Sequence, residues 1–316
     1  MLAVASAGVG ATGRVVAMPE DGQPSGAAER SKLAPGLHLI ATPIGNLGDL
    51  SPRALAVLRL ADLVVCEDTR VTRKLLRHHG IERALLAYHE HNAARMRPQI
   101  VARLQAGAVV ALASDAGTPL ISDPGYKLVR AAIEAGAEIF AVPGPSAVLA
   151  ALTVSGLPTD RFLMAGFLPE RGAARRRALD GLGAVPATTL VLFEAARRLP
   201  ATLAELAAAL GPRPAAVARE LTKRFEQVRR GSLEQLAADY ARAGPPKGEV
   251  VLVIGAAADG APRALSTLDA ALGDALATMS PAAAAATVAA ATGRPRREVY
   301  RRALALRQAA GPADEG

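Results

Sequence analysis

Cysteine and aromatic residues are scarce in this sequence, and each shortage excludes a class of protein. Cys66 is the only cysteine among 316 residues, so an internal disulfide and a cysteine-rich metal site are excluded, which agrees with a reducing cytosol. Cys66 follows Leu63-Val64-Val65, so we expect a buried structural thiol. Aromatic residues make up 3% and tryptophan is absent, so any nucleic-acid binding would depend on backbone contacts more than on base stacking.

Long apolar runs and a balancing number of acidic residues are also missing. Gly, Pro or a charged residue interrupts every apolar stretch well short of the ~20 residues that a membrane-spanning helix needs, so we expect a soluble, cytoplasmic protein without a membrane partner. The 37 Lys and Arg against 29 Asp and Glu give a formal net charge of +8. Such a surface favours a polyanionic partner, with an ordinary soluble basic protein as the alternative.

Residues 1–34 are rich in Ala and Gly and lack the basic start of a signal peptide. We expect a disordered tail here, with Met18 as an alternative start. Residues 8–13, Gly-Val-Gly-Ala-Thr-Gly, have the spacing of a dinucleotide-binding loop, but no convincing strand precedes them and Pro19 interrupts a following helix. We therefore assign no function to this motif.

From Leu37 onward, short apolar runs alternate with amphipathic stretches, which predicts an α/β fold whose first sheet is largely parallel. We place an N-terminal α/β domain at 35–147 and a C-terminal α/β domain at 148–256. The expected strands are 37–41, 63–66, 109–113, 139–142, 162–165, 189–193, 215–219 and 250–254. The expected helices are 52–60, 71–79, 97–105, 126–135, 199–210 and 233–240.

Residues 257–316 are predicted to form a linker and a small helical module. Leu268, Leu272 and Leu276 fall on one helical stripe, Pro281 starts a second helix and Pro295 leads into a third. Three short helices with a basic entry to the last resemble a helix-turn-helix module. Its arginines either bind nucleic acid or form only a solvated helix face: Arg294, Arg296, Arg297, Arg301 and Arg302.

Four loops of small residues are candidates for ligand binding. They are Thr-Pro-Ile-Gly-Asn at 42–46, Ser-Asp-Ala-Gly-Thr-Pro at 114–119, Pro-Gly-Pro-Ser-Ala at 143–147 and Pro-Pro-Lys-Gly-Glu at 245–249. Three follow expected strands of one sheet, and ligands of open α/β sheets bind beyond the carboxyl ends of the strands. The sequence has no Walker loop, no metal-spaced His or Cys cluster and no Ser/His/Asp signature, so we expect a metal-free cofactor held largely by backbone.

Further motifs follow one another along the chain. They are Leu-Ile-Ala-Thr-Pro-Ile-Gly-Asn-Leu at 39–47, Glu-Asp-Thr-Arg at 67–70, Thr-Arg-Lys-Leu-Leu at 72–76, Tyr-His-Glu-His-Asn at 88–92, Ser-Asp-Pro-Gly at 122–125, Ser-Gly-Leu-Pro at 155–158, Gly-Phe-Leu-Pro at 166–169, Arg-Glu-Leu-Thr-Lys at 219–223 and Lys-Gly-Glu at 247–249. In this order they resemble the ribosomal RNA small subunit methyltransferase I family, which are 2′-O-ribose methyltransferases of the tetrapyrrole methylase superfamily. The resemblance covers residues 36–256 and, more loosely, the helical tail.

This resemblance implies two α/β domains with S-adenosylmethionine in the cleft between them, S-adenosylhomocysteine as product, no metal and a homodimer. It implies cofactor contacts from both domains: Ile44, Gly45, Asp115, Ala116, Gly117, Thr118, Ser146, Ala147, Phe193, Glu194, Glu220 and Gly248. The chain departs from the family at 194–198, where it reads Glu-Ala-Ala-Arg-Arg instead of Glu-Ser/Ala-Pro-His-Arg. The backbone path after that strand therefore stays open.

Methyl transfer to a 2′-hydroxyl is an in-line displacement, so positioning, worth ~7–11 kcal/mol, matters more than a general base, worth ~10²–10⁴-fold. The catalytic candidates are Asp68, Arg70 and Lys223. We expect Arg70 to hold RNA phosphate, Asp68 to orient it or the ribose, and Lys223 to neutralise a phosphate or act as the base. Alternatively, Asp68 caps a helix and pairs with Arg70, Lys223 pairs with Glu226 on a helix, and Asp115 forms only an Asx turn.

RNA contacts are expected from side chains outside the cofactor loops: Arg73, Lys74, His89, His91, Arg171, Arg175, Arg176, Arg177, Arg296 and Arg297. We interpret residues 171–177 as a polar loop, placed near the substrate entrance by the resemblance, with a solvated mobile loop as the alternative. The spacing of His89 and His91 could suit a metal, but without a third ligand RNA contact or ordinary loop polarity is the better interpretation.

The sequence thus predicts a methyltransferase that acts on a cytidine ribose in the decoding region of 16S ribosomal RNA, with the 30S subunit as its partner. A tetrapyrrole or corrin methyltransferase of the same fold is one alternative, which the Arg-rich stretches and the net charge of +8 disfavour. A non-catalytic ribosome-binding protein that uses only the helical module is the other.

Overall fold

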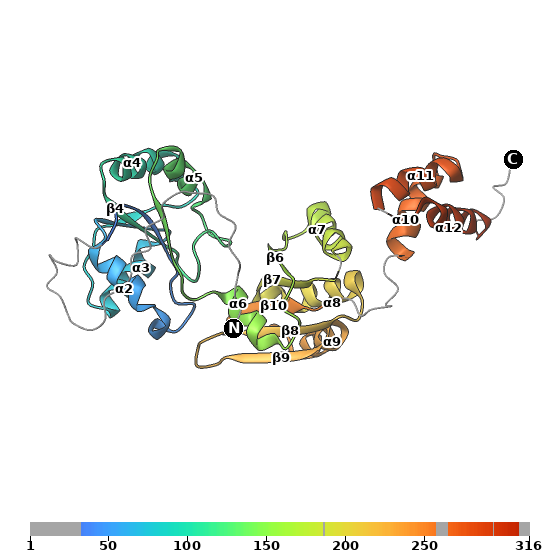
Figure 1. The fold of residues 1–316 in the computed structure, drawn as a ribbon. Helices are drawn as coiled ribbons and strands as arrows, with labels where there is room; N and C mark the ends of the chain where they lie inside the picture. The colour runs from blue at the N-terminus through green and yellow to red at the C-terminus, as the bar shows by residue number, and fades with distance from the viewer. Residues whose placement is uncertain (1–32, 186, 257–264, 293, 310–316) are drawn as a thin grey trace, which may run out of the picture. The chain divides into compact units, whose positions relative to one another are not determined.

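The computed structural model describes residues 33–185, 187–256, 265–292 and 294–309 (Figure 1). The chain divides into an N-terminal unit, residues 1–43 with 47–145, and a C-terminal unit, residues 44–46 with 146–316. The predicted linker at 257–264 and all but the last two residues of the predicted tail lie outside the described residues. We describe each unit by itself.

The N-terminal unit holds a five-stranded parallel sheet in the order β3-β2-β4-β1-β5. Its strands are β1 (Gly36–Ile40), β2 (Leu63–Cys66), β3 (Leu85–Ala87), β4 (Val109–Ala113) and β5 (Ile139–Val142). Its helices are α2 (Pro52–Leu60), α3 (Thr69–His78), α4 (Ala93–Gln105) and α5 (Tyr126–Glu134), with a 3-10 turn at Leu47–Asp49. The short β3 was not predicted, because three residues are too few to show a pattern.

Both faces of this sheet are buried, because side chains alternate along each strand. In β4, Ala111 and Ala113 join a core with residues of α2 and α3. Val110 and Leu112 join a second core with residues of α4 and α5. The apolar runs therefore have no polar alternation, which is why they read as buried strands in the sequence.

The C-terminal unit holds a mixed five-stranded sheet in the order β6-β7-β10-β8-β9, in which only the pair of β6 and β7 is parallel. Its strands are β6 (Phe162–Phe167), β7 (Thr189–Ala195), β8 (Pro214–Arg219), β9 (Gln227–Ser232) and β10 (Glu249–Ile254). Its helices are α6 (Ala147–Ser155), α7 (Gly172–Ala184), α8 (Leu199–Leu210) and α9 (Leu233–Ala243), with a 3-10 turn at Ala196–Arg198. β9, α6 and α7 were not predicted.

A small three-helix module ends the described chain. It consists of α10 (Leu265–Leu276), α11 (Pro281–Thr292) and α12 (Arg296–Ala309), as predicted. Leu268 and Leu272 pack with Val288 and Val299 in its core. An ion pair of 2.6 Å between Arg302 and Asp269 joins α12 to α10. Among the described helices, none has the length and apolarity to cross a membrane.

Candidate active site

The loops that follow β1, β4 and β5 meet at the carboxyl edge of the N-terminal sheet. The backbones of Thr42 and Gly117 exchange two hydrogen bonds of 2.9 and 3.0 Å, and the Thr42 hydroxyl donates to the Ser114 carbonyl oxygen over 3.0 Å. The Thr118 hydroxyl donates to the Pro145 carbonyl oxygen over 3.2 Å. Three loops that are far apart in the sequence therefore form one surface, as the parallel strand order predicts.

Asp115 connects this surface to the end of β2. Its Oδ1 accepts a hydrogen bond from the backbone N–H of Asp68 over 3.1 Å, so the side chain does more than form a local Asx turn. Burial raises the pKa of Asp115, although the hydrogen bond from Asp68 works in the opposite direction. Ala116 is exposed and Gly117 has a φ of 83°, so the small neighbours leave room beside the carboxylate.

Asp68 and Arg70 make the contacts of the structural alternative. The Asp68 side chain accepts from the backbone N–H of Arg70 and so caps the N-terminus of α3. The Arg70 guanidinium also donates to the Asp68 carboxylate, with a shortest distance of 2.6 Å. The hydrogen bonds from the Arg70 side chain lower the pKa of Asp68 to about 2. Asp68 is therefore ionised at neutral pH, and the Arg70 side chain, 86% exposed, remains accessible to a ligand.

A small pocket at the same edge contains carboxyl groups that the sequence analysis did not select. Its lining includes Glu67, Tyr88, Ser114 and Asp123. Asp123 Oδ2 is buried without a hydrogen-bond partner among the described residues. Burial, with the charges of Glu67 and Asp115, raises the pKa of Asp123 to about 6. The Ser-Asp-Pro-Gly motif at 122–125 was the signal that could have identified this carboxyl group.

The predicted RNA-binding residues of the N-terminal unit lie on α3 and before α4. Arg73 and Lys74 are exposed on α3. The His89 and His91 rings are 6.0 Å apart, edge to face. Within the described ranges, no group of three or more His, Cys, Asp or Glu could hold a metal ion.

In the C-terminal unit, the segment 44–46 lies against α6 and Lys223. Ile44 belongs to the same core as Val148 of α6. Gly45 has a φ of 153°, and a Cβ there would lie 2.4 Å from Lys223 Cγ, so only glycine fits without a shift. The Ser146 hydroxyl caps α6, whose first residue is Ala147.

Lys223 is held by two carboxylates. Its Nζ lies 2.8 Å from Glu220 Oε1 and 2.8 Å from Glu249 Oε2. Burial lowers the pKa of Lys223, but these ion pairs outweigh it and the net shift is upward. The raised pKa favours a role for Lys223 as a positive charge over a role as a base. The predicted helical pair with Glu226 is wrong, because residues 221–225 form turns and the Glu226 carboxylate accepts from the Thr222 N–H instead.

Gly248 completes this group. A Cβ on Gly248, which has a φ of 98°, would lie 2.4 Å from the Glu220 side chain. The Glu220 backbone itself is left-handed, with a φ of 52°. Strained backbone of this kind persists where the surrounding structure fixes it, and it concentrates at functional sites.

Phe193 and Glu194 have different surroundings from each other. Phe193 packs against Phe167 with ring centroids 5.5 Å apart. Glu194 is buried at 3% exposure, and its carboxylate accepts from the Ala195 N–H, the Arg198 Nε and the Thr202 hydroxyl. Both carboxylate oxygens of Glu194 thus accept hydrogen bonds from residues of the same unit. The backbone continues in β7 through Ala195 and then turns.

The prediction of a polar loop at 171–177 is wrong, because these residues begin α7. Arg175 is 7% exposed, and its guanidinium donates to Glu205 Oε2, the Pro169 carbonyl oxygen and the Thr202 hydroxyl. Arg175 is therefore a packing residue that RNA cannot reach. The helix instead leaves its other predicted arginines exposed: Arg171, Arg176 and Arg177.

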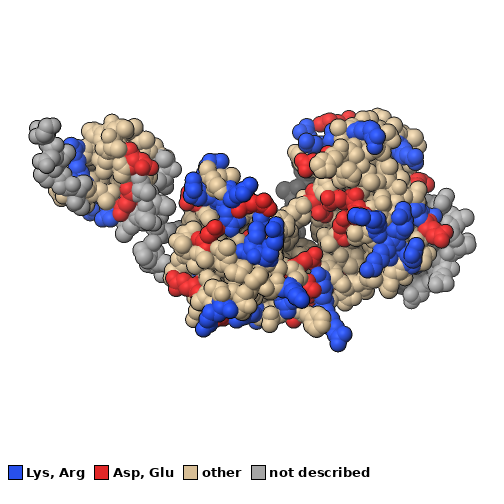
Figure 2. Space-filling view, turned by 180° about the vertical axis from the view of Figure 1, so that it is seen from behind, with Lys and Arg blue, Asp and Glu red and all other residues tan. Residues whose placement is uncertain are grey.

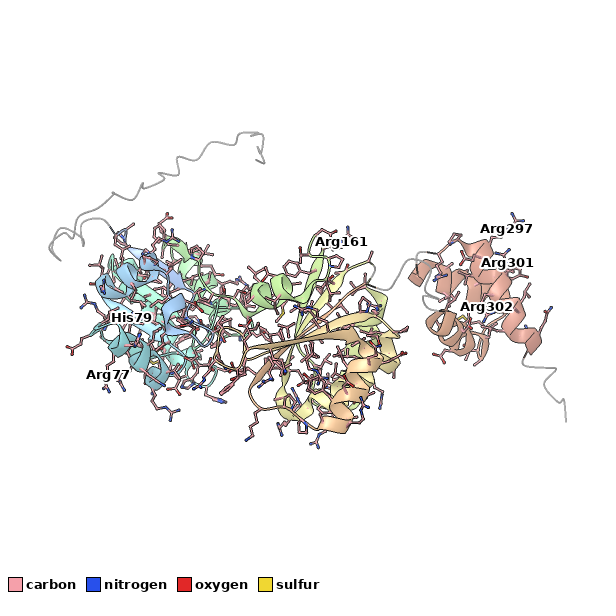
Figure 3. The ribbon with its side chains drawn as sticks, turned by 90° about the horizontal axis from the view of Figure 1, so that it is seen from below. Arg77, His79, Arg161, Arg297, Arg301 and Arg302 are labelled. Atoms are coloured by element: carbon pink, nitrogen blue, oxygen red, sulfur yellow. The ribbon has the colours of Figure 1, made fainter. Side chains whose placement is uncertain are left out.

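Arg296 and Arg297 begin α12 and are exposed. Figure 3 labels Arg297, Arg301 and Arg302 on this helix. Arg302 carries the ion pair with Asp269, whereas the side chains of Arg297 and Arg301 have no ion pair within the described part of the module. Arg302 therefore stabilises the module, whereas Arg297 and Arg301 are available to contact a ligand.

Sequence and structure comparisons agree with this architecture. Residues 36–237 match the family of Tetrapyrrole (Corrin/Porphyrin) Methylases, and residues 264–307 match the RsmI C-terminal HTH domain. The chain is 51% identical to the "Ribosomal RNA small subunit methyltransferase I" of Mesorhizobium japonicum over 90% of this chain and 96% of that protein. It is 50% identical to the protein of the same name from Erythrobacter litoralis, over 87% of this chain and 96% of that protein.

Solved structures share the fold at low sequence identity. A diphthine synthase superposes with a TM-score of 0.55 at 17% identity, covering 70% of this chain and 89% of that chain. A cobalt precorrin-4 methyltransferase superposes with a TM-score of 0.52 at 19% identity, covering 74% and 97%. At this identity the superpositions establish the fold alone.

Proposed function

The chain belongs to the ribosomal RNA small subunit methyltransferase I family, and from this premise we propose that it methylates small-subunit ribosomal RNA with S-adenosylmethionine. The acceptor is the 2′-hydroxyl of a cytidine ribose in the decoding region of 16S RNA. The protein acts in the cytoplasm on the 30S subunit or its RNA and releases S-adenosylhomocysteine. No metal takes part.

One observation supports the cofactor assignment most strongly: carboxyl groups lie on and beside the surface formed by the loops after β1, β4 and β5. Asp115 lies on the surface, and Glu67 and Asp123 line the adjacent pocket. The cofactor carries a sulfonium and an ammonium group, and its ribose and adenine are hydrogen-bond donors. Carboxylates and backbone groups are suitable partners for all of them. The buried Asp123 Oδ2 is an acceptor for which the described residues supply no donor, so the residues fit the group.

The C-terminal unit would hold the cofactor through backbone and shape. Gly45 and Gly248 allow close approach of main chain, and Ser146 and Ala147 begin α6, where free N–H groups favour anionic ligand groups such as a carboxylate. Glu194 contributes by fixing the end of β7, since its side chain is already satisfied.

S-adenosylmethionine supplies the methyl group, and the protein's residues position the acceptor. Arg70 is exposed and bound on one side by Asp68, so it can hold an RNA phosphate while Asp68 fixes its direction. Lys223, kept protonated by Glu220 and Glu249, supplies positive charge and not proton abstraction. Alignment of the reacting atoms is then the main contribution of the site.

We also propose a homodimer. β6 is an edge strand, and three of its apolar side chains are more than a third exposed: Phe162 at 42%, Leu163 at 38% and Phe167 at 54%. Exposed apolar edges of this kind are covered in stable proteins. Light scattering should show a dimer for the unaltered protein and a monomer for Leu163→Lys. A monomeric unaltered protein would contradict the proposed homodimer.

The decisive experiment offers three acceptors with labelled S-adenosylmethionine: isolated 30S subunits, free 16S RNA and a tetrapyrrole. We expect label in RNA, at a cytidine 2′-oxygen when the RNA is digested. Transfer only to the tetrapyrrole would favour the corrin alternative. Failure to bind the cofactor at all would favour a binding protein without catalysis.

A further inference from the structure

A second pocket lies at the other end of α3, away from the loop surface. Its volume is about 370 Å³, which is ample for a phosphate group, and it belongs wholly to the N-terminal unit. Three arginines contribute to its lining, with Glu82 as the only acidic side chain. The arginines are Arg73, Arg77 and Arg83.

The backbone at this pocket is set by the way α3 ends. Gly80 has a φ of 63°, its N–H donates to the Arg77 carbonyl oxygen over 3.1 Å, and the Ile81 N–H donates to the Leu76 carbonyl oxygen over 2.9 Å. These are the two hydrogen bonds of a Schellman motif, which satisfy carbonyl groups at the helix end. No atom lies within 4 Å of the position that a Cβ on Gly80 would take, so the pocket is open there.

The arginines of the pocket have unused hydrogen-bonding capacity. Arg73 and Arg77 are exposed, and their side chains form no ion pair or hydrogen bond with another residue that the structure describes. The Arg83 guanidinium donates to the carbonyl oxygens of Glu82 and Arg59, but its Nε is buried and has no partner among the residues that the structure describes. A buried donor without an acceptor destabilises the folded state, so an acceptor at this place would be favourable.

The surroundings of the pocket are also positive. The pKa of His79, at the end of α3, is lowered by burial and further by the charges of His78 and Arg59. Figure 3 shows Arg77 and His79 on the same part of this unit. Figure 2 shows a dense group of Lys and Arg side chains on one face of this unit, with Asp and Glu side chains beside it.

We propose that this pocket binds a backbone phosphate of the RNA substrate, an inference that rests on the proposed function. An extended polyanion fits better than a free anion, because the basic residues continue along one face of α3. Arg70, Arg73, Lys74 and Arg77 have the i, i+3, i+4, i+7 spacing of one helix face and span about 10 Å of helix. The pocket lining contains no aromatic side chain on which a base could stack.

The test uses the full-length protein and a fluorescent RNA oligonucleotide with the sequence of the 16S decoding region. Its dissociation constant is measured between about 50 and 200 mM salt for the unaltered protein, for Arg77→Gln and for Arg103→Gln. Arg103 is exposed on α4, which packs on the opposite face of the sheet from α3. The two variants therefore lose the same charge in different places.

Loss of one phosphate contact should reduce the slope of log Kd against log salt by about 0.7–0.9 in Arg77→Gln and leave it unchanged in Arg103→Gln. Binding of labelled S-adenosylmethionine and the melting temperature should stay unchanged in both variants. An unaltered slope in Arg77→Gln, or equal changes in the two variants, would overturn the pocket assignment while methylation by the unaltered protein upholds the proposed function.

Inorganic phosphate distinguishes a site for a free phosphate ion from a site for a phosphate of the RNA backbone. If millimolar phosphate raises the melting temperature of the unaltered protein but not of Arg77→Gln, and RNA binding is the same in both, the pocket is a site for a free anion and the RNA assignment is overturned. If the unaltered protein neither binds nor methylates RNA, the proposed function fails together with the inference.

Discussion

The two ends of α3, a helix of ten residues, differ in the acidic groups that lie beside them. At its N-terminus Asp68 caps the helix, and Asp115 hydrogen-bonds to the same residue. Between its middle and its C-terminus Arg73 and Arg77 line a pocket with Arg83. The Asp68 cap and Arg77 in the last turn agree with the helix dipole, which favours acids at the N-terminus and bases at the C-terminus by about 0.3–1 kcal/mol each. Arg70 in the first turn does not follow this preference.

Agreement with the dipole means that charge alone does not identify a ligand site. The difference lies in groups that the protein leaves unsatisfied. Asp123 Oδ2, near the acidic end, and Arg83 Nε, at the basic end, are both buried without partners in the described structure. We infer that the acidic end receives the cationic cofactor and that the basic end receives the anionic RNA.

The largest expected effect on ligand binding is at the acidic end. Asp115→Ala removes the carboxylate that we propose contacts the cofactor, and with it the acceptor for the Asp68 N–H. The affinity for S-adenosylmethionine should therefore fall about 10–100-fold, as for loss of a hydrogen bond to a charged group. Isothermal titration would measure it. Asp62→Ala is a matched control, since Asp62 Oδ2 accepts from the Val109 N–H over 2.9 Å at the opposite edge of the same sheet. Equal losses in both variants would indicate a general defect in folding.

Arg175 tests whether a charge serves the fold and not a ligand. Arg175→Ala leaves the Glu205 carboxylate and the Pro169 carbonyl oxygen without their donor, so the free energy of unfolding should fall by about 2–3 kcal/mol. Arg176→Ala on the same helix should change it by less than about 0.5 kcal/mol, because that side chain is exposed. Urea unfolding of both variants checks this, and similar values would contradict the structural role.

Most of the N-terminal sheet could be predicted from the sequence because its strands are buried on both faces. β2, β4 and β5 have the predicted bounds, since each is a continuous apolar run. β9 was missed because Gln227–Ser232 contains two arginines and no apolar run. It is an edge strand whose place is decided by pairing with β8, which local pattern does not encode.

The candidate site shows the same division between local and tertiary causes. Loop sequences of small residues identified the surface that contains Asp115, because such loops have few other uses. Arg175 and Arg176 look alike in the sequence, yet one is buried and one exposed, since the helix turns them by about 100° from each other. Asp123 was missed because its raised pKa comes first from burial and then from the charges of Glu67 and Asp115, and the fold determines all three.

The pH dependence of stability should show the unsatisfied carboxyl group directly. Asp123 has a folded pKa of about 6 against an ordinary value of 3.8, so the folded state holds more protons than the unfolded state between these values. The contribution of Asp123 to stability is therefore fully present below pH 3.8 and is lost as pH rises to about 6. Asp123→Asn should remove about 1–2 kcal/mol of this fall, after allowance for solvent screening. Thermal melts from pH 4 to 7 measure the difference, and parallel curves would refute it.

The smallest expected effect concerns the helical module, whose basic face should behave like the basic end of α3. Arg297→Gln removes one exposed charge on α12, so RNA affinity should fall about two- to fivefold and the salt slope should decrease, while S-adenosylmethionine binding stays the same. Arg302→Gln is the contrasting variant, because Arg302 is paired with Asp269. Arg302→Gln should lower the melting temperature and leave the slope of log Kd against log salt nearly unchanged. If Arg302→Gln alone reduced the slope, α12 would bind RNA through a different face.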